Sequence, residues 1–275
     1  MEGRLEVPPS KEYQKQEVEN IIVACNRISA QIVASELPVL SRELICSYNA
    51  QVLHALLPEK EVVPGEFRRH SVVVGNVYRG APPEDGAYLV DRLCEWLNGP
   101  DFAAKPDMEL VYAIIKAVLA HVYLAWIHPF GDGNGRTARL TELHLLMSAG
   151  MPSPAAHLLS NHYNETRPEY YRQLDHASKS GGDLLPFLRY AVHGLVDGLR
   201  AQLLFVWEQQ WDITWRNYVH ELFQHKSSAS DVRQRHLALD LGATKDWVNV
   251  GDIDELTPRP AKRTRIRHRR RCTVI

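Results

Sequence analysis

Apolar residues recur at alternating intervals of three and four positions over much of the chain, a spacing that predicts amphipathic α-helices. Over residues 13–35 they form a single stripe, made of Val18, Ile21, Cys25, Ile28 and Ile32. A second helix is expected from Ser41 to Pro58, because proline cannot continue a helix. The same periodicity and the glycine and proline stops predict further helices over residues 84–98, 108–127, 134–150 and 166–179.

Two of these predicted helices carry additional signals. The helix over residues 108–127 is apolar on nearly all sides, which places it at the centre of the fold, with His121 filling a position in the core or in a groove. The helix over residues 166–179 opens with the Thr166-x-x-Glu169 spacing of a capping box. Its pair of aromatic residues, Tyr170 and Tyr171, is expected to pack against the bundle.

A longer helical pattern follows a glycine-rich turn and N-cap at residues 180–183. It covers residues 184–223, with Gly194 and Gly198 as candidate breaks. Large aromatic side chains follow one another along it, at Phe205, Trp207, Trp211 and Trp215. They predict either a self-association face, which would make a homodimer, or a wide core, and the pattern leaves both readings open.

Residues 60–83 change character and predict a short β-hairpin. Val62 to Gly65 and Ser71 to Val77 are rich in β-branched residues and are bounded by glycine and proline. Between them Arg68, Arg69 and His70 form a cationic cluster that we expect to be solvated rather than bound to an acidic target. The predicted fold class is therefore all-α, a helical bundle with a short β-hairpin.

The composition is that of an ordinary globular protein, with 275 residues, of which 45% are hydrophobic and 24% charged. The pattern divides the chain into a lead-in, a main domain, a region of weaker pattern and a basic tail, at residues 1–12, 13–223, 224–258 and 259–275. The tail holds eight of the 32 lysines and arginines and no acid, within residues 259–271. We expect it to be a disordered terminus, and the one place where nucleic acid or an acidic partner would bind.

Neither a membrane nor a secretion pathway is expected from the sequence. The longest apolar run, Leu110 to Ile127, is interrupted by Lys116 and His121, and the N-terminus lacks a basic region followed by an apolar core. The four cysteines show no paired spacing. These features indicate a reducing compartment and a cytoplasmic location.

The candidate chemistry lies between the two most apolar helices, in the stretch His-Pro-Phe-Gly-Asp-Gly-Asn-Gly-Arg-Thr-Ala-Arg, which spans His128 to Arg139. Pro129 ends the preceding helix, and three glycines allow positive φ angles, so that successive N–H groups can converge on one anion. The next helix begins near Asn134 or Gly135, and its N-terminus favours negative charge. The stretch therefore predicts a loop that binds an anion.

Four charged or titratable side chains of this loop fit nucleotide chemistry. Arg136 and Arg139 lie on one face of the first helical turn and suit phosphate oxygens. Asp132 is an oxygen ligand of the kind that holds Mg²⁺ beside phosphates, and His128 can accept a proton at neutral pH. Three other readings stay open: a structural metal pair of His128 and Asp132, a glycine-rich capping turn without chemistry, and a folded module that only binds.

The stretch resembles the signature of the Fic family, His-Pro-Phe-x-Asp/Glu-Gly-Asn-Gly-Arg-x-x-Arg, and it fills every fixed position. The resemblance implies that AMP is transferred from ATP, with Mg²⁺, to a Tyr, Thr or Ser hydroxyl of a target protein. It assigns the proton acceptor to His128, the Mg²⁺ ligand to Asp132, the α-phosphate to Asn134 with the Gly133 and Gly135 amides, and the outer phosphates to Arg136 and Arg139. The nucleotide-binding set it implies is Phe130, Gly131, Asp132, Gly133, Asn134, Gly135, Arg136 and Arg139, with Phe130 as a packing anchor.

The resemblance also bears on the partner and on the reaction type. It makes the hairpin a flap, and it implies that the target binds along residues 66–80 by strand addition. It places Tyr170 and Tyr171 near the nucleotide base, as an alternative to simple packing. The related Doc branch, which phosphorylates, usually has lysine in place of Gly135, so Gly135 argues against phosphorylation. A catalytically silent adaptor, or transfer of a different nucleotide or phosphoryl group, remains the alternative.

Regulation is the least complete part of the resemblance. Many Fic enzymes carry an inhibitory helix, Ser/Thr-x-x-x-Glu-Gly/Asn, whose glutamate pairs with the arginine that matches Arg139. Glu2-Gly3 and Glu19-Asn20 are partial matches here. We prefer Glu2 as the remnant and expect Glu19 on the surface, so that ATP binding should be less inhibited than in a relative with a complete inhibitory helix.

Overall fold

The structure is a computed structural model that describes residues 9–34, 36, 38–56, 61–74 and 78–243. The candidate regulatory residue Glu2, part of the predicted hairpin and the whole basic tail lie outside the described residues. Contacts divide the chain into two compact units, Met1–Leu199 and Arg200–Ile275. This division comes earlier than the boundary at residue 223 expected from the sequence.

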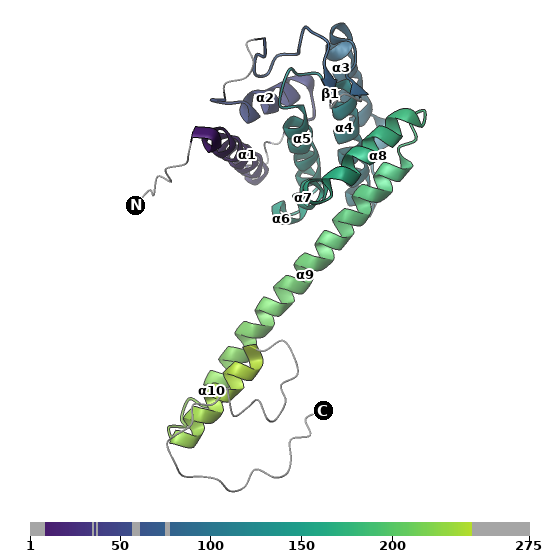
Figure 1. Ribbon diagram of the computed structural model, residues 1–275. Helices are drawn as coiled ribbons and strands as arrows, with labels where there is room; N and C mark the ends of the chain where they lie inside the picture. Colours follow the sequence, from purple (N-terminus) through teal and green to yellow (C-terminus); the bar gives the residue numbers. More distant parts are fainter. Residues whose placement is uncertain (1–8, 35, 37, 57–60, 75–77, 244–275) are drawn as a thin grey trace. The chain divides into compact units, whose positions relative to one another are not determined.

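Helices make up nearly all of the described secondary structure, which confirms the all-α prediction (Figure 1). The helices are α1 (Pro9–Val33), α2 (Arg42–Val52), α3 (Gly86–Leu97), α4 (Glu109–Ile127), α5 (Asn134–Ser148), α6 (Ser153–Ala156), α7 (Leu158–Glu165), α8 (Arg167–Lys179), α9 (Leu185–Leu222) and α10 (Ala229–Ala243), with 3₁₀ turns η1 (Pro83–Asp85) and η2 (Pro100–Phe102). The first helix begins four residues before Tyr13, so the predicted lead-in is partly helical.

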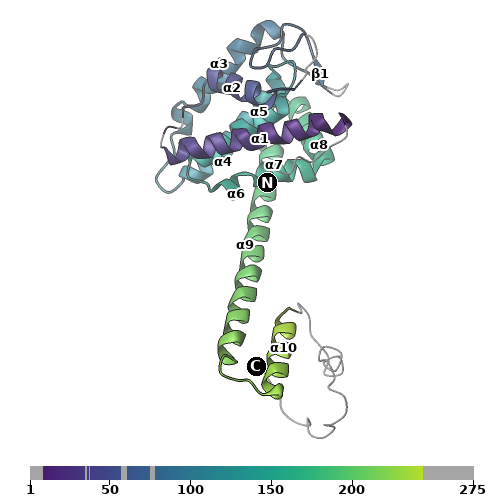
Figure 2. The same cartoon turned by 90° about the vertical axis from the view of Figure 1, so that its left-hand side faces the viewer.

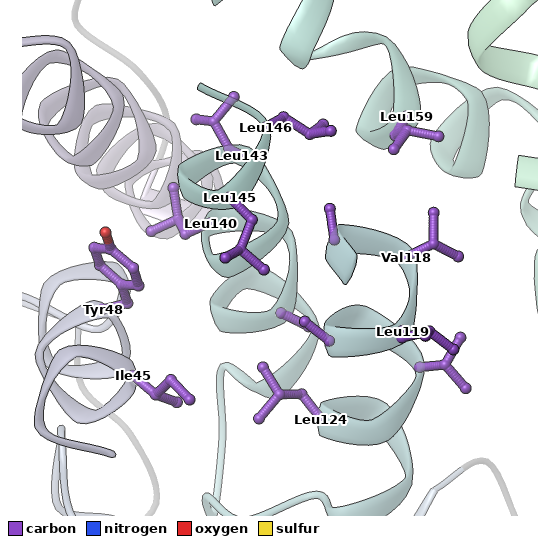
Figure 3. Packing of buried hydrophobic residues seen from close by; sticks show 14 of the residues in the cluster. Ile45, Tyr48, Val118, Leu119, Leu124, Leu140, Leu143, Leu145, Leu146 and Leu159 are labelled. Carbon is purple, nitrogen blue, oxygen red and sulfur yellow. The ribbon is translucent and has the colours of Figure 1, made fainter. Parts of the chain in front are cut away.

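The core of the first unit is built around the neighbouring helices α4 and α5. Figure 3 shows leucines of α5 between Ile45 and Tyr48 of α2 on one side and the second half of α4 on the other. In Figure 2, α1 lies across this layer, where it contacts α2 and α5. The loop that joins α4 to α5 is therefore held between two helices that the core fixes on several sides.

Helix α4 is buried in its second half, while Leu110, Val111 and Ile115 near its start are exposed. By length and composition it is the one described helix that could cross a membrane, and half of that stretch is buried within the protein. Core helices of soluble proteins have the same length and composition. His121 lies in the buried half, as expected for a core position.

The predicted hairpin is only partly confirmed. Strands β1 (Val73–Val74) and β2 (Tyr78–Arg79) pair in antiparallel register. The stretch from Val62 to Gly65 does not join them, and Val62 instead packs against Gly131, where a Cβ would lie 2.7 Å from the valine side chain. Burial against the loop thus overrides the β-propensity of Val62.

The candidate breaks at Gly194 and Gly198 are wrong, because α9 runs unbroken through both. A Cβ at Gly194 would lie 2.1 Å from the His162 ring, and one at Gly198 would lie 3.1 Å from Leu158. Both glycines therefore allow close packing of α7 on α9. The tertiary contact compensates for the low helix propensity of glycine.

The predicted capping box at the start of α8 does not form. Thr166 precedes the helix, but its hydroxyl donates to the His162 carbonyl oxygen at 2.6 Å, and it makes no cap hydrogen bond. Glu169 accepts from Arg172 and Gln173 within its own helix instead. Helix α7 ends directly before α8, so a carbonyl group of its last turn competes for the threonine hydroxyl.

Candidate active site

His128 ends helix α4 and opens the loop. Its backbone is left-handed, with φ 49° and ψ 56°, and its N–H donates to the Leu124 carbonyl oxygen at 3.0 Å. The ring Nδ1 lies 3.3 Å from the Ala125 carbonyl oxygen. A carbonyl can only accept, so the tautomer that fits this contact has its proton on Nδ1 and a lone pair on Nε2. Burial lowers the pKa of His128 below its ordinary 6.5, which keeps the ring neutral at pH 7.

Arg68 anchors the loop, and the expectation that it is solvated is wrong. Only 5% of Arg68 is exposed. Its Nε donates to the His128 carbonyl oxygen at 2.7 Å, its Nη1 to that of His70 at 2.7 Å, and its Nη2 to that of Ala81. Arg69, its neighbour, is exposed as predicted. The end of α4 supplies carbonyl groups that need a buried donor, and one guanidinium satisfies several of them.

Replacing Arg68 with methionine should lower the free energy of unfolding by about 3 kcal/mol, because buried carbonyl groups lose their donor. Urea unfolding followed by circular dichroism measures this difference. Arg69→Met is the matched control, since its exposed side chain should change stability by less than about 0.5 kcal/mol. Equal stability of the two variants would contradict the anchoring role of Arg68.

Phe130 and Asn134 shape the loop between them. The Phe130 N–H donates to Asn134 Oδ1 at 2.9 Å, and Asn134 Nδ2 donates to the Phe130 carbonyl oxygen at 2.7 Å. Phe130 is buried, packs on Phe67 and forms an isolated β-bridge with it. The predicted packing role of Phe130 agrees with this position. Both polar atoms of the Asn134 amide group therefore bond within the loop, and this side chain fixes the conformation of the loop.

Asn49 of α2 holds the start of α5, although no sequence signal pointed to it. It is fully buried, and its Nδ2 donates to the Asp132 carbonyl oxygen at 2.9 Å and to Thr137 Oγ1 at 3.2 Å. Its Oδ1 accepts from the Gly65 N–H at 2.9 Å. Gly133 beside it has φ 75°, and a Cβ there would lie 3.1 Å from the asparagine amide. Glycine is therefore required both by the backbone angle and by the packing.

The N-terminus of α5 opens directly after this turn, where the first N–H groups of a helix have no partner within the helix. Arg139 folds back along the first turn, and a Cβ at Gly135 would lie 3.4 Å from its Nη1. The charge of Arg139 also reaches Tyr170, whose pKa is raised mainly by burial but is lowered by this arginine. The arginine thus lies beside the helix N-terminus.

Arg136 is held by two carboxylates. Its Nη1 lies 2.5 Å from Glu17 Oε1 of α1, and its Nη2 lies 3.1 Å from Asp132 Oδ1. Asp132 also accepts from the Gly133 N–H. Glu19 pairs with Lys15 and is exposed, as predicted. The carboxylate that reaches the loop from α1 is therefore Glu17, which the motif comparison did not single out.

A neutral histidine stands at one end of the loop, and a helix N-terminus with two arginines follows at the other end. Residues 39–146 match the model described as Fic/DOC family. Residues 39–146 therefore form a Fic/DOC family domain. The protein adenylyltransferase Fic of Drosophila virilis is 32% identical over 190 residues, covering 69% of this chain and 35% of that protein. Protein adenylyltransferase fic-1 of Caenorhabditis briggsae is 32% identical over 193 residues, covering 69% and 34%. The chain thus spans about a third of the length of these curated relatives.

Solved structures show the same architecture. A fragment of Fic-1 from Caenorhabditis elegans is 28% identical with a TM-score of 0.54, covering 72% of this chain and 54% of that one. A Fic family protein from Desulfovibrio desulfuricans has a TM-score of 0.58 at 21% identity, covering 84% and 65%, and this likeness concerns the fold alone. The all-α Fic fold predicted from the motif is thus confirmed.

The residues that the motif predicted for the Fic site follow one another from the end of α4 into the first turns of α5. Asp132 pairs with Arg136, and Gly135 leaves room for Arg139. For a divalent cation, the motif offers the single carboxylate of Asp132. No group of three or more His, Cys, Asp or Glu that could hold a metal is found among the described residues. One carboxylate together with substrate phosphates is the donor set that suits Mg²⁺, so the residues present fit that ion.

A buried polar network lies behind the site and was not predicted as such. His121 Nε2 lies 2.9 Å from the Tyr170 hydroxyl, Tyr163 donates to Glu142 at 3.0 Å, and His121 Nδ1 faces Glu142 at 3.5 Å. His121 and Glu142 are almost completely buried. The network ties α4 and α5 to α7 and α8. Tyr170 packs within it, as expected, while Tyr171 is exposed beside it.

Proposed function

We propose that this chain transfers AMP from ATP to a hydroxyl group of a target protein. In this reaction the target oxygen forms a bond to the α-phosphorus, the bond to the oxygen that bridges the α- and β-phosphates breaks, and pyrophosphate leaves. The hydroxyl proton passes to Nε2 of His128, which is neutral and keeps a lone pair. The observation that carries the proposal is this proton acceptor at one end of a loop whose other end is a helix N-terminus with two arginines.

The relatives support the same activity, since those that match over 69% of this chain are named protein adenylyltransferase. The N–H groups at the start of α5 would hold the phosphate nearest the reaction, and Arg136 and Arg139 would hold the outer phosphates. Asp132 would hold Mg²⁺, which neutralises charge on the phosphates. The orientation of ATP would follow from Gly135, because a longer side chain there would displace Arg139.

The target would bind along the hairpin of β1 and β2. The hairpin is anchored next to the loop, because Tyr78 donates to the Trp126 carbonyl oxygen of α4 at 2.8 Å. The Gly80 N–H donates to the Val72 carbonyl oxygen at 3.2 Å and continues the pairing of the two strands. A two-stranded sheet leaves an edge that can pair with an extended segment. Main-chain pairing would place a hydroxyl at His128 without specifying the neighbouring side chains.

The rate should stay constant as the pH falls through 7 and should drop only below pH 6.5, the ordinary pKa of histidine. The reason is that burial lowers the pKa of His128, and a base with a lowered pKa stays unprotonated to lower pH. The pH dependence of kcat/KM for labelling of a target, between about pH 5 and pH 8, measures this midpoint. A midpoint above 6.5 would contradict the assignment of His128 as the neutral base.

Protein labelling in a cell lysate, with ATP that carries its isotope at the α- or the γ-phosphate, tests the proposed reaction. Label from the α position alone, lost in His128→Ala, is the expected result. Label from the γ position would mean phosphorylation and a reversed nucleotide. No label from ATP, together with label from another nucleotide, would correct the donor, and no label from any nucleotide would favour a silent adaptor.

A further inference from the structure

The second unit exposes a long apolar face on its part of α9. Large side chains recur there at intervals of three and four residues, at Leu204, Trp207, Trp211, Trp215, Tyr218 and Leu222. This spacing places them on one side of the helix. Trp207 is 64% exposed and Trp211 is 66% exposed, and the Trp211 and Trp215 rings stack with their planes 13° apart. We call these six residues the α9 stripe.

Helix α10 covers only one edge of the α9 stripe. Trp215 Nε1 donates to the Ala238 carbonyl oxygen at 2.9 Å, and a Cβ at Gly242 would lie 2.1 Å from the Trp215 ring, so the two helices touch closely there. The next positions around α9, Val219 and Phe223, are buried. Helix α10 itself has no buried residue among those described. The pair of helices is therefore a hairpin closed on one side and open along the stripe.

The size of the open face points to a protein partner. Its exposed side chains amount to roughly 500 Å², at about 100 Å² for each half-exposed large residue. Patches of this size are among the largest on a soluble monomer and are often functional. A standard protein interface buries about 800 Å² from each partner, so the stripe alone supplies more than half of one side.

We propose that two copies of this chain associate through the α9 stripe, so that α9 and α10 of each copy form a four-helix bundle. Two helical hairpins, each with an open apolar face, can pair to form such a bundle. A two-fold axis lets the same face serve both copies. The polar positions of this part of α9 carry mixed charges, at Arg200, Glu208, Asp212, Arg216 and Glu221. This mixture fits a bundle surface, whereas a helix that lies on a membrane carries mainly lysine and arginine there.

Size-exclusion chromatography with light scattering, on the full chain over a range of concentrations, tests the proposal. Wild type should have the mass of a dimer, and Trp207→Glu/Trp211→Glu should raise the dimer dissociation constant at least about 100-fold, since buried tryptophans dominate such interfaces. Gln209→Glu is the control for added negative charge, because it introduces one glutamate about 160° around the helix from the stripe, and it should leave the dimer intact.

Three results would overturn the proposal. The first is a wild type that is monomeric at every concentration. If its tryptophans were then shielded from a soluble quencher, a segment of the same chain would cover the α9 stripe. Alternatively, the double variant could dimerise as tightly as wild type, which would place the interface elsewhere. Circular dichroism checks that the variants keep their helices. Leu204→Glu, which lies on the stripe away from the α10 contact, gives the same test if the double variant unfolds, and it overturns the proposal if it leaves the dimer unchanged.

Discussion

Replacing His128 with alanine should lower the rate of AMP transfer about 10²- to 10⁴-fold, the usual loss when a general base is removed. ATP affinity should change by less than about twofold, because the phosphates are held by the start of α5 rather than by the histidine ring. Single-turnover labelling with ATP carrying an α-phosphate isotope measures the rate. Calorimetry measures the affinity on the same protein.

Measuring rate and affinity separately distinguishes the loss of a base from a disturbance of the loop. His128 also ends α4, and its carbonyl group accepts from Arg68, so a change at this residue could act by disturbing the loop. A disturbed loop would weaken ATP binding as well as the rate, whereas loss of a base alone would not. His176→Ala is the control, since that histidine is exposed on α8. A variant of His128 that keeps its full rate would remove the histidine from the reaction.

The sequence was sufficient to predict the loop, because the signals for it are local. Pro129 and the glycines end one helix and allow the turn into the next, and Gly133 does adopt the positive φ that this turn requires. The apolar pattern on both sides predicted that α4 and α5 would be buried. Such signals depend on a few neighbouring residues, so contacts with the rest of the chain do not change them.

Residues that contact the loop but lie far from it in the sequence could not be predicted in the same way. Arg68 is 60 positions from His128, and Asn49 is 83 positions from Asp132. A cation in a polar cluster is usually solvated, and an asparagine in a helix usually faces water. Both become buried here because carbonyl groups at the end of α4 and in the loop before α5 need donors. That need is visible only when the helices are placed side by side.

The errors over Thr166 and Gly194 have the same origin. Each local rule, a capping box or a helix break at glycine, was applied without the neighbouring helix that decides the outcome. Helix α7 provides both competing contacts, a carbonyl oxygen for the Thr166 hydroxyl and the His162 ring against Gly194. Tertiary contacts of this kind exceed local preferences of about 1 kcal/mol.

Arg136→Ala should weaken ATP binding about 10- to 100-fold, because charge-assisted hydrogen bonds to phosphate are lost. Glu17→Gln should have the opposite effect and strengthen ATP binding about 3- to 10-fold. The Glu17 carboxylate lies 2.5 Å from Arg136 and occupies the donor that a phosphate would use. Calorimetric titration with a non-hydrolysable ATP analogue measures both changes.

Glu19→Gln provides the matched control, since it removes the same charge from the same helix. Glu19 is exposed and pairs with Lys15, so its loss should leave ATP affinity unchanged. If Glu19→Gln strengthened binding as much as Glu17→Gln, the cause would be the overall charge of α1 rather than competition for one arginine. If Glu17→Gln had no effect, the carboxylate would move aside without cost when nucleotide binds. A gain confined to Glu17 would mean that α1 takes part in setting the affinity of the site, through an acid that no part of the motif contains.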